Sequence, residues 1–419
     1  MKLLLVSFWF PPTNEIGAVR VGKLAKYLVG QGHDVRVLAG PAIGNLTLPL
    51  EIPADLVTRA GEAPGGAGAA APSRRSDLLQ RLLPMDPSGQ EDIFRLHYYA
   101  LRHIPDKRSP WRAPAVAAGL KLFESWRPDL ILASGPPFTG LVVGADLSAA
   151  SGIPWIAELR DPWVGNPYIL WPAWRRLLDR ALEWRTLRGA RALVTVSPLV
   201  GRDLARRYPM PVITVLNGYS QDDLPSPAPR PRTERLSIVY TGAVYAGLRD
   251  PSALFAAMAL LGPRAAEVEV VFYGPLANSV MALAARHGVE RHVAVRPGIP
   301  YLDSLRRQAA ADVLLLLQRN HVSDEGNIPA KFFEYIGVRR PILLLGCETG
   351  VIANMIRERG AGVVSNDPAT IAAHLRGWLD MLPQGIADAP PAAREGLSRE
   401  EQFAAYERFL TGGLASPAP

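Results

Sequence analysis

The sequence predicts an α/β fold built from two doubly wound parallel sheets. Short apolar runs, each of a length that suits a buried strand, alternate with stretches of helical periodicity along the whole chain. At 419 residues the chain is long enough for two domains, and a proline-rich stretch at 222–234 separates its halves. The runs that we expect to form strands are 2–7, 34–39, 130–133, 154–158, 192–196, 212–216, 236–241, 268–273, 293–295, 312–317 and 341–345.

These features divide the chain into parts. Residues 1–221 are the expected N-terminal domain, 222–234 the linker and 235–398 the C-terminal domain. Residues 399–419 are expected to form a last amphipathic helix and a tail. Within the first domain, residues 61–92 contain runs of glycine and alanine that cannot support a core, so we expect a mobile loop there.

Composition narrows the class of protein. Hydrophobic residues make up 48% of the chain, which favours a well-packed globular protein. No apolar run approaches the roughly 18 residues of a membrane-spanning helix. Cys347 is the only cysteine, so an intrachain disulfide is excluded and a cytoplasmic location is expected. Because no cluster of cysteine and histidine has metal-ligand spacing, we expect neither a metal ion nor a cofactor.

The net charge of +7 calls for an acidic partner or another explanation. Nucleic acid, anionic lipid and phosphorylated small molecules all suit a basic protein. The alternative is a genome of high GC content, which would account for the many alanine, proline and arginine residues. Composition alone leaves these explanations open.

Polar loops follow four of the strands expected in the first domain, at 9–17, 134–139, 160–163 and 197–202. The carboxyl ends of parallel strands meet at one edge of a sheet, where a doubly wound domain binds its ligand. Gly17 lies at the start of the first helix, where a missing side chain would let the backbone approach a phosphate or sugar.

The stretch from Asp324 to Gly346 predicts a ligand site in the second domain. A helix is expected to open at Ile328-Pro329-Ala330, between two buried strands, and to end at Gly337. The amino terminus of a helix attracts anions, and Lys331 adds a full positive charge there. Glu334 lies on nearly the same helical face, where a carboxylate could hold sugar hydroxyls. The alternative is an ordinary strand–helix–strand unit with a surface Lys–Glu pair.

The order Pro-x-Lys-x-x-Glu-Tyr at 329–335 resembles the donor-site motif of retaining GT-B glycosyltransferases, in the family 4-like group of bacterial surface-polysaccharide biosynthesis. In that motif one glutamate contacts the transferred sugar, and a second, eight positions later, holds the ribose. Glu334 matches the second, whereas the first position falls on Gly326, with Glu325 beside it. The resemblance implies two Rossmann-like domains and a C-terminal helix that crosses back to the first domain.

The resemblance also implies how the donor diphosphate is held. Gly242 and, seven residues later, Arg249 fit a family pattern of a glycine followed by a basic pair, although the first basic position falls on Ala243. Lys331 and Arg249 would then stabilise the departing diphosphate without a metal ion. Gly350 and Val351 would meet the donor sugar through backbone N–H groups.

The acceptor side is implied by phrases in the first half. Residues 128–137 and 160–163 match family phrases in the same order, and Gly17 and Arg20 fit the pattern that follows the first strand. These matches place Gly17, Arg20, Ser134, Arg160 and Asp161 on the acceptor side. Without the resemblance, Arg20 would be read as a solvated helix residue. Asp161 either accepts a hydrogen bond from the acceptor hydroxyl or caps the next turn.

The function implied is retaining transfer of a hexosyl-type sugar from a nucleoside-diphosphate sugar, such as a UDP-sugar, to a hydroxyl of a lipid-linked saccharide or polysaccharide precursor. Such a protein would be cytoplasmic or peripheral at the inner face of the cell membrane. The arginine-rich helix expected at 171–191 either faces an anionic membrane or pairs its arginines with Asp179 and Glu183.

Three other functions are compatible with parts of this sequence. A nucleotide-sugar epimerase shares the fold, and a glycosyltransferase of the same kind could instead tailor a small-molecule metabolite. A non-catalytic basic protein would bind anionic lipid or nucleic acid. Nucleic acid is not expected as a partner, because the aromatic residues cluster with prolines in loops and form no strand platform.

Overall fold

The computed structural model describes the chain as two compact units. Among the described residues, unit 1 contains 1–196 and 200–214, and unit 2 contains 197–199 and 215–412. The expected mobile loop at 61–92 lies outside the described residues from 62 onward, as do Ala243 and most of the proline-rich stretch. The ranges described are 1–61, 93–169, 171–226, 234–242, 244, 248–274 and 277–412.

Unit 1 contains a parallel sheet of seven described strands in the order β3-β2-β1-β4-β5-β6-β7. The chain starts at β1, runs outward to β3, and then returns to the other side of β1 with β4. The order of the strands therefore reverses between β1 and β4. The strands are β1 Lys2–Ser7, β2 Asp34–Ala39, β3 Val57–Arg59, β4 Leu130–Gly135, β5 Trp155–Leu159, β6 Ala192–Thr195 and β7 Val212–Thr214.

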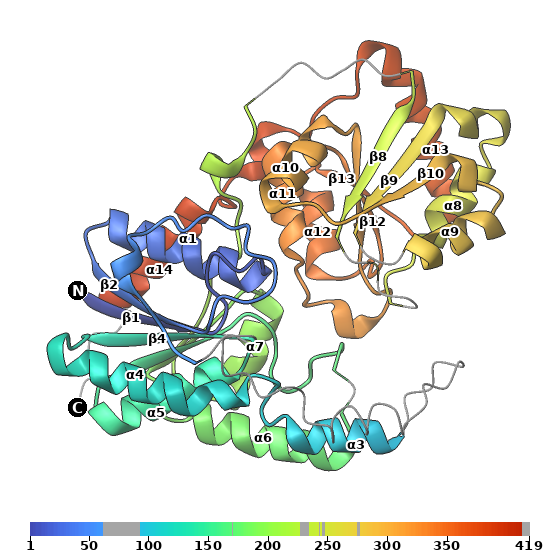
Figure 1. Ribbon diagram of the computed structural model, residues 1–419. Helices are drawn as coiled ribbons and strands as arrows, with labels where there is room; N and C mark the ends of the chain where they lie inside the picture. Colours follow the sequence, from blue (N-terminus) through green and yellow to red (C-terminus); the bar gives the residue numbers. More distant parts are fainter. Residues whose placement is uncertain are drawn as a thin grey trace. The chain divides into compact units, whose positions relative to one another are not determined.

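Helices cover both faces of this sheet, with α1 on one face and α4 and α5 side by side on the other (Figure 1). The strand β4 is buried along its whole length, which explains why its sequence is a continuous apolar run. The helices of this part of the chain are α1 Ile16–Gly30, α3 Ile93–Arg102, α4 Arg112–Ser125, α5 Thr139–Ser151, α6 Ala173–Leu187 and α7 Pro198–Arg207.

Unit 2 repeats the arrangement with a parallel sheet of six described strands in the order β10-β9-β8-β11-β12-β13. Here the order reverses between β8 and β11. Ligands bind at such reversal points in open α/β sheets, outside the carboxyl ends of the strands. The strands are β8 Leu236–Thr241, β9 Val268–Tyr273, β10 Val293–Arg296, β11 Val313–Leu317, β12 Ile342–Leu345 and β13 Gly362–Val364.

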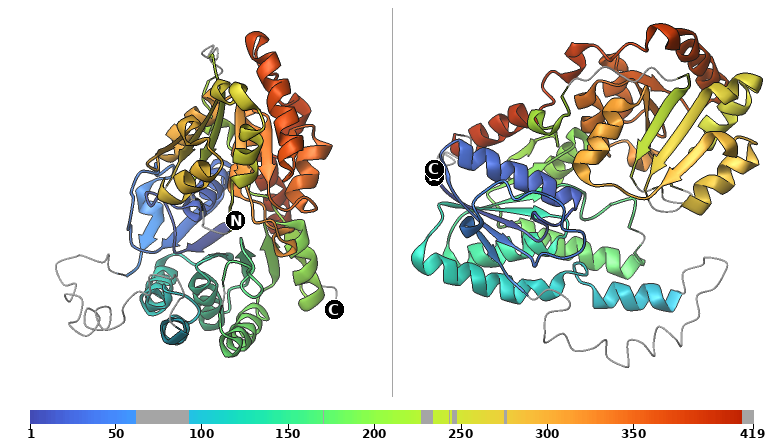
Figure 2. Two further views of the ribbon diagram at one scale, coloured as in Figure 1. Left: turned by 90° about the vertical axis from the view of Figure 1, so that its right-hand side faces the viewer. Right: turned by 45° about the horizontal axis from the view of Figure 1, so that its top comes forward.

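Two apolar cores lie on the two faces of this second sheet. One packs α8, α9 and α13 against the sheet, and the other packs α11 and α12 against it, as the views in Figures 1 and 2 show. The helices of unit 2 are α8 Ser252–Ala259, α9 Ala277–Arg286, α10 Tyr301–Ala310, α11 Ala330–Val338, α12 Val351–Glu358, α13 Pro368–Met381 and α14 Arg399–Thr411.

The predicted end of the helix at Gly337 is wrong. The helix α11 continues to Val338, and Arg339 takes the left-handed conformation that ends it, with a φ of 61°. A Cβ atom on Gly337 would lie 3.0 Å from the side chains of Tyr219 and Leu224. Glycine suits this position because the segment that contains Tyr219 and Leu224 packs closely against α11.

The last helix, α14, is anchored within unit 2 by its first turn. The backbone N–H of Arg399 donates to the carbonyl of Tyr219 at 2.7 Å, and the backbone N–H of Leu216 donates to the side chain of Gln402 at 2.7 Å. Ser398 caps the helix in a capping box with Glu401. Packing of this helix on the first domain stays a prediction.

Candidate active site

Three loops meet at the carboxyl edge of the second sheet, because they follow the neighbouring strands β8, β11 and β12. Gly242 comes directly after β8, the segment 318–329 follows β11, and the segment 346–350 follows β12. The six donor-side residues predicted from the sequence all lie on these loops or in the first turns of α11. We call this region the donor edge.

At the donor edge, Lys331 lies against the backbone of Gly242. A Cβ atom on Gly242 would be 2.3 Å from the Lys331 Nζ atom, so only glycine leaves room for the ammonium group. Gly242 also has a φ of 131°, a conformation that favours glycine. The N–H of Gly242 donates to the carbonyl of Tyr273 at 2.7 Å, which fixes this turn to the neighbouring strand.

The surroundings of Lys331 disfavour its protonated, positively charged form. Burial lowers the pKa of Lys331, the nearby Glu334 opposes this effect, and Arg249 lowers the pKa further. Arg249 is therefore close enough for two positive charges to repel each other. An anion bound between them would relieve this repulsion, which is the electrostatic requirement for holding a diphosphate.

Glu334 is 7% exposed and is oriented by a residue that sequence analysis missed. The Nε2 atom of Gln308 donates to Glu334 Oε2 at 2.7 Å and to Thr241 Oγ1 at 2.9 Å. Gln308 itself is fully buried on α10. Leu305 and Gln308, three positions apart on one face of that helix, are both buried. A glutamine at a core-facing helical position needs a polar partner. The position of Gln308 on the apolar side of its helix could therefore have indicated that it binds a buried polar group.

Behind Glu334 lies a second polar group of residues. Tyr301 donates from its hydroxyl to Asp223 Oδ2 at 3.2 Å, and Arg399 Nη1 lies 3.7 Å from the same carboxylate. Burial raises the pKa of the Tyr301 hydroxyl; Arg399 opposes this rise, while Glu334 and Asp223 add to it. This network joins α10, α14 and the segment before β8, and no sequence motif indicated it.

Glu325 and Gly350 lie side by side at the start of α12. The backbone N–H of Val351 donates to the carbonyl of Glu325 at 2.8 Å, and Thr349 Oγ1 donates to Glu325 Oε1 at 2.8 Å. The N–H of Val351 is therefore already bonded, contrary to its predicted contact with a donor sugar. The carbonyl of the other predicted residue, Gly326, accepts from Ser197 Oγ at 2.6 Å within unit 2.

The carboxyl edge of the first sheet, which we call the acceptor edge, is organised by a buried ion pair. Arg20 Nη2 lies 2.8 Å from Glu158 Oε1, and Ser134 Oγ donates to Glu158 Oε2 at 2.5 Å. Glu158 is fully buried, and burial would raise the pKa of its carboxyl, but Arg20, Ser134 and Arg160 together lower it. Arg20 is thus neither solvated nor pointing at open solvent.

Arg160 bridges the loops that follow β1 and β4. Its Nη1 atom donates to the Gly17 carbonyl at 2.8 Å, and its Nη2 atom donates to the Pro136 carbonyl. A Cβ atom on Gly17 would lie 2.4 Å from Arg160 Nη1. The glycine that was expected to admit a ligand therefore admits the Arg160 guanidinium group.

Asp161 follows Arg160 at the same edge. Burial by the surrounding protein raises the pKa of its carboxyl, and the neighbouring Arg160 opposes this rise. Asp161 nevertheless exposes part of its surface to solvent, so the raised pKa reflects the density of protein around the residue and not a fully enclosed side chain. The structure thus brings Gly17, Arg20, Ser134, Arg160 and Asp161 to one sheet edge, with Glu158 as the residue that sequence analysis missed.

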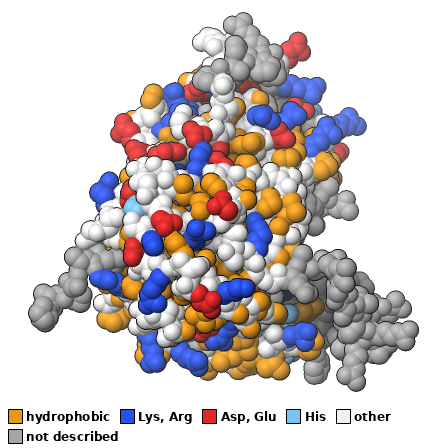
Figure 3. Space-filling view, turned by 60° about the vertical axis from the view of Figure 1, so that its left-hand side comes forward, with side chains coloured by type: hydrophobic (Ala, Val, Ile, Leu, Met, Phe, Trp, Pro, Cys, Tyr) orange, Lys and Arg blue, Asp and Glu red, His pale blue; other side chains and the backbone are white. Residues whose placement is uncertain are grey.

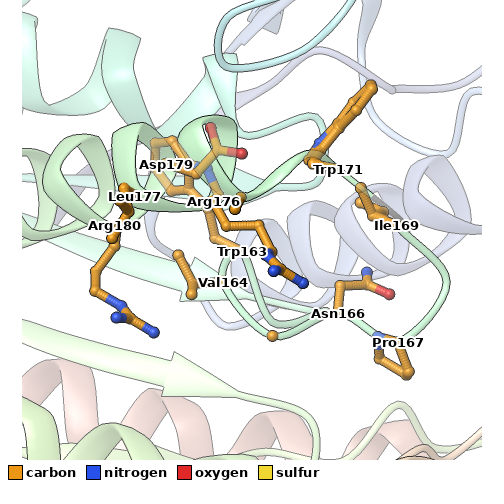
Figure 4. Close-up of a pocket in the computed structure, with 12 residues that line it drawn as sticks. Trp163, Val164, Asn166, Pro167, Ile169, Trp171, Arg176, Leu177, Asp179 and Arg180 are labelled. Carbon is orange, nitrogen blue, oxygen red and sulfur yellow. The ribbon is translucent and has the colours of Figure 1, made fainter. Parts of the chain in front are cut away.

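A cavity of about 590 Å³ adjoins this edge. Trp163 lines it and stacks on Phe138 with ring centroids 4.9 Å apart, which connects the cavity to the loop after β4. Figure 4 shows Arg176 and Arg180 extending from α6 along one side, with Trp171 and Ile169 on the other. The cavity therefore combines aromatic surface with two cations.

Comparison with known proteins decides the class of enzyme. Residues 17–218 match the family described as glycosyl transferase 4-like domain. This chain is a glycosyltransferase of the GT-B fold. The match favours transfer over the epimerase and binding-protein alternatives. No curated protein is significantly similar to the glycosyltransferase in sequence.

Solved structures share the fold of the glycosyltransferase along its whole length. Sucrose-phosphate synthase from Thermosynechococcus elongatus is 13% identical, with 98% of each chain covered and a TM-score of 0.66. HepE from Anabaena in complex with UDP-glucose is also 13% identical, with 98% of this chain and 99% of that chain covered and a TM-score of 0.61. WaaG, a glycosyltransferase involved in lipopolysaccharide biosynthesis, is 15% identical, with coverages of 99% and 100% and a TM-score of 0.58.

Proposed function

We propose that this glycosyltransferase moves a sugar, with retention of the anomeric configuration, from a nucleoside-diphosphate sugar to a hydroxyl of a lipid-linked saccharide or polysaccharide precursor. The observation that carries the donor assignment is the contact between Lys331 and Gly242, next to the charge of Arg249. Lys331 and Arg249 bring two positive charges close together at this strand edge, an arrangement that suits a diphosphate.

In the proposed reaction the bond between the anomeric carbon and the diphosphate oxygen breaks, and its electron pair leaves with the diphosphate. Lys331 and Arg249 stabilise the charge that develops there. Glu334, held by Gln308, accepts hydrogen bonds from the ribose hydroxyls. Glu325 or a backbone group at 326 or 350 contacts the sugar.

The acceptor hydroxyl forms the new bond to the anomeric carbon. Asp161 orients this hydroxyl by accepting its hydrogen bond, while Arg160 fixes the loops around it. Retention places the new bond on the face that the diphosphate leaves, so an oxygen of the leaving diphosphate takes the proton. The cavity lined by Trp163, Trp171, Arg176 and Arg180 suits an acceptor that carries both a sugar ring and a phosphate.

Domain organisation completes the proposal. Residues 1–221 would act as the acceptor-side domain and 235–398 as the donor domain, with 222–234 as the linker between them. The helix α14 would cross back to the first domain. A polysaccharide or lipid acceptor is favoured over a small metabolite by the likeness in fold to WaaG, a glycosyltransferase involved in lipopolysaccharide biosynthesis.

The test is a transfer assay with purified protein. A panel of UDP-, GDP- and dTDP-sugars is offered with lipid-linked saccharide acceptors, and the product linkage is assigned by NMR. Transfer with retained configuration is expected from one donor, and should fall sharply in Lys331→Ala and Glu334→Ala. Lys121→Ala and Glu124→Ala, at exposed positions on α4, serve as matched controls. Near-normal turnover in both site variants would contradict the donor assignment. A product with inverted anomeric configuration would contradict the proposed retention.

A further inference from the structure

The helices α3 and α6 together expose a surface of large apolar side chains. Trp174 and His97 stack with ring centroids 6.1 Å apart, and Trp174 Nε1 lies 3.0 Å from His97 Nδ1, which joins the two helices. Leu101 is 67% exposed, Leu177 64% and Trp184 53%. We call this surface the α3–α6 face; its exposed apolar residues are Tyr98, Leu101, Trp174, Leu177, Leu178 and Trp184.

The charges on α6 are distributed unusually, because its acidic residues are buried and its basic residues are mostly exposed. Asp179 pairs with the buried Arg175 at 2.9 Å. Glu183 accepts from the Tyr208 hydroxyl at 2.7 Å and from the backbone N–H of Val164 at 2.9 Å, and it forms a salt bridge with Arg207. Both carboxylates are therefore used inside the unit, and only one of them pairs with an arginine of α6.

The exposed arginines of α6 form no salt bridge with a carboxylate of the described residues. In the described part of the chain, no salt bridge involves Arg176, Arg180 or Arg185. Arg188 lies over the ring of Trp184, with its guanidinium carbon 4.9 Å from the ring centroid. On the face of the molecule that Figure 3 draws, basic side chains lie among hydrophobic ones over much of the surface. The α3–α6 face thus combines apolar and cationic groups and exposes no carboxylate from either helix.

This combination fits the surface of an anionic lipid bilayer. Tryptophan, tyrosine and leucine side chains enter the boundary between headgroups and acyl chains, and arginine stems lie along apolar surface while their heads reach lipid phosphates. A protein partner of mixed charge would instead favour both signs on this face. None of the described helices is long and apolar enough to cross a bilayer, so contact through this face would be peripheral.

We propose that the α3–α6 face docks unit 1 on an anionic lipid surface. Leu101, Leu178 and Trp184 would insert, and Arg185 and Arg188 would contact lipid phosphates. None of these five residues lines the cavity beside the acceptor edge. The inference does not depend on the donor assignment, because it concerns residues that take no part in sugar transfer.

The test is co-sedimentation of the full chain with vesicles of phosphatidylcholine alone or with 30% phosphatidylglycerol. We expect binding only to the anionic vesicles, weakened as ionic strength rises. Arg185→Gln combined with Arg188→Gln should reduce the partition coefficient by about fivefold for each arginine removed. Leu101→Ser, Leu178→Ser and Trp184→Ser together should abolish it. Circular dichroism and thermal melting establish that these exposed substitutions leave the fold intact.

Matched controls remove the same groups elsewhere. Arg286→Gln with Arg291→Gln lowers the net charge equally at exposed positions of unit 2, and Leu260→Ser with Met381→Ser removes exposed apolar groups. Both controls should bind vesicles as the unmodified protein does. Three results would overturn the proposal: no vesicle binding, equal binding to both vesicle types, or equal losses in face and control variants. A dimer that the triple serine variant dissociates would assign the face to a second copy instead.

Discussion

Lys331 and Gly242 are packed so closely that a single added carbon atom on Gly242 would lie 2.3 Å from the Lys331 ammonium nitrogen. The two residues are far apart in sequence, and the contact sets the position of the only lysine on α11. The donor edge is therefore sensitive to the smallest possible change in side-chain volume.

Gly242→Ala should displace the Lys331 ammonium group and reduce transfer by about 10²- to 10³-fold, comparable to losing a group that stabilises a developing negative charge. It should also cost on the order of 1–3 kcal/mol of stability, because alanine is strained at a φ of 131°. Gly377→Ala is the control, since nothing lies within 4 Å of its position on α13, and it should stabilise by about 0.5–1 kcal/mol. Normal transfer by Gly242→Ala would show that Lys331 does not act from this position.

Lys331→Met should abolish transfer without lowering the free energy of unfolding at pH 7. The native pKa of Lys331 lies below its ordinary value, so the protonated lysine costs stability in the empty site at every pH below that native pKa. Methionine fills similar space without this cost. Urea denaturation at pH 7 measures the difference. A loss of stability by more than about 1 kcal/mol would mean that the lysine holds the fold together.

The affinity for a nucleoside diphosphate should fall at alkaline pH. Lys331 loses its proton as pH rises through its lowered native pKa, which lies below the ordinary 10.5, and the neutral amine attracts the diphosphate less. In the same window, between the native pKa and 10.5, the empty protein gains stability because the native state binds fewer protons. Calorimetric titration of the nucleotide between pH 7 and 10 follows the affinity, and urea denaturation of the empty protein over the same range follows the stability. An affinity that stays constant to pH 10 in the unmodified protein would contradict this prediction.

Glu158→Gln should destabilise unit 1 by about 3–5 kcal/mol, because it leaves Arg20 buried beside a neutral amide. The native pKa of Glu158 is below the ordinary 4.5, so its stabilising contribution is complete above pH 4.5 and is lost as pH falls through the native pKa. The variant should lack this acid-dependent loss. Glu124→Gln, at an exposed position, should change neither quantity. Chemical denaturation from pH 7 to 3 measures both, and equal curves for Glu158→Gln and the unmodified protein would refute the ion pair.

Asp161→Asn should lower kcat for transfer by about 10²-fold and leave the affinity for the nucleotide unchanged, because an amide orients an acceptor hydroxyl less well than a carboxylate. Steady-state kinetics with the acceptor and calorimetry with the nucleotide separate the two effects. Asp55→Asn, also exposed in unit 1, is the control. Unchanged kcat would leave Asp161 as a residue that only caps its turn.

The sequence was sufficient for the central strands, because parallel strands such as β4 are buried on both faces and appear as apolar runs. It did not indicate the edge strands β3 and β13, which have three residues each and no apolar run of that kind. It could not identify Glu158 or Gln308, whose partners are 138 and 26 residues away and become neighbours only in the folded sheet. The sequence alone does not distinguish a glycine that ends a helix from one that makes room for a neighbouring side chain. Gly337 is of the second kind, because it packs against Tyr219, and the predicted end of the helix was therefore wrong. The sequence left open whether the arginines of α6 pair with Asp179 and Glu183. Asp179 does pair with an arginine of α6, Arg175, whereas Glu183 pairs with Arg207 from another helix.

The central claim is that Lys331 at the donor edge binds the diphosphate of the sugar donor. Calorimetric titration of UDP, GDP and dTDP into the unmodified protein, Lys331→Met and Lys121→Met tests it most directly. We expect one nucleotide to bind the unmodified protein and the Lys121→Met control equally, and to bind Lys331→Met at least tenfold more weakly, a difference of about 1.4 kcal/mol or more. Equal affinity of that nucleotide for all three proteins would contradict the account.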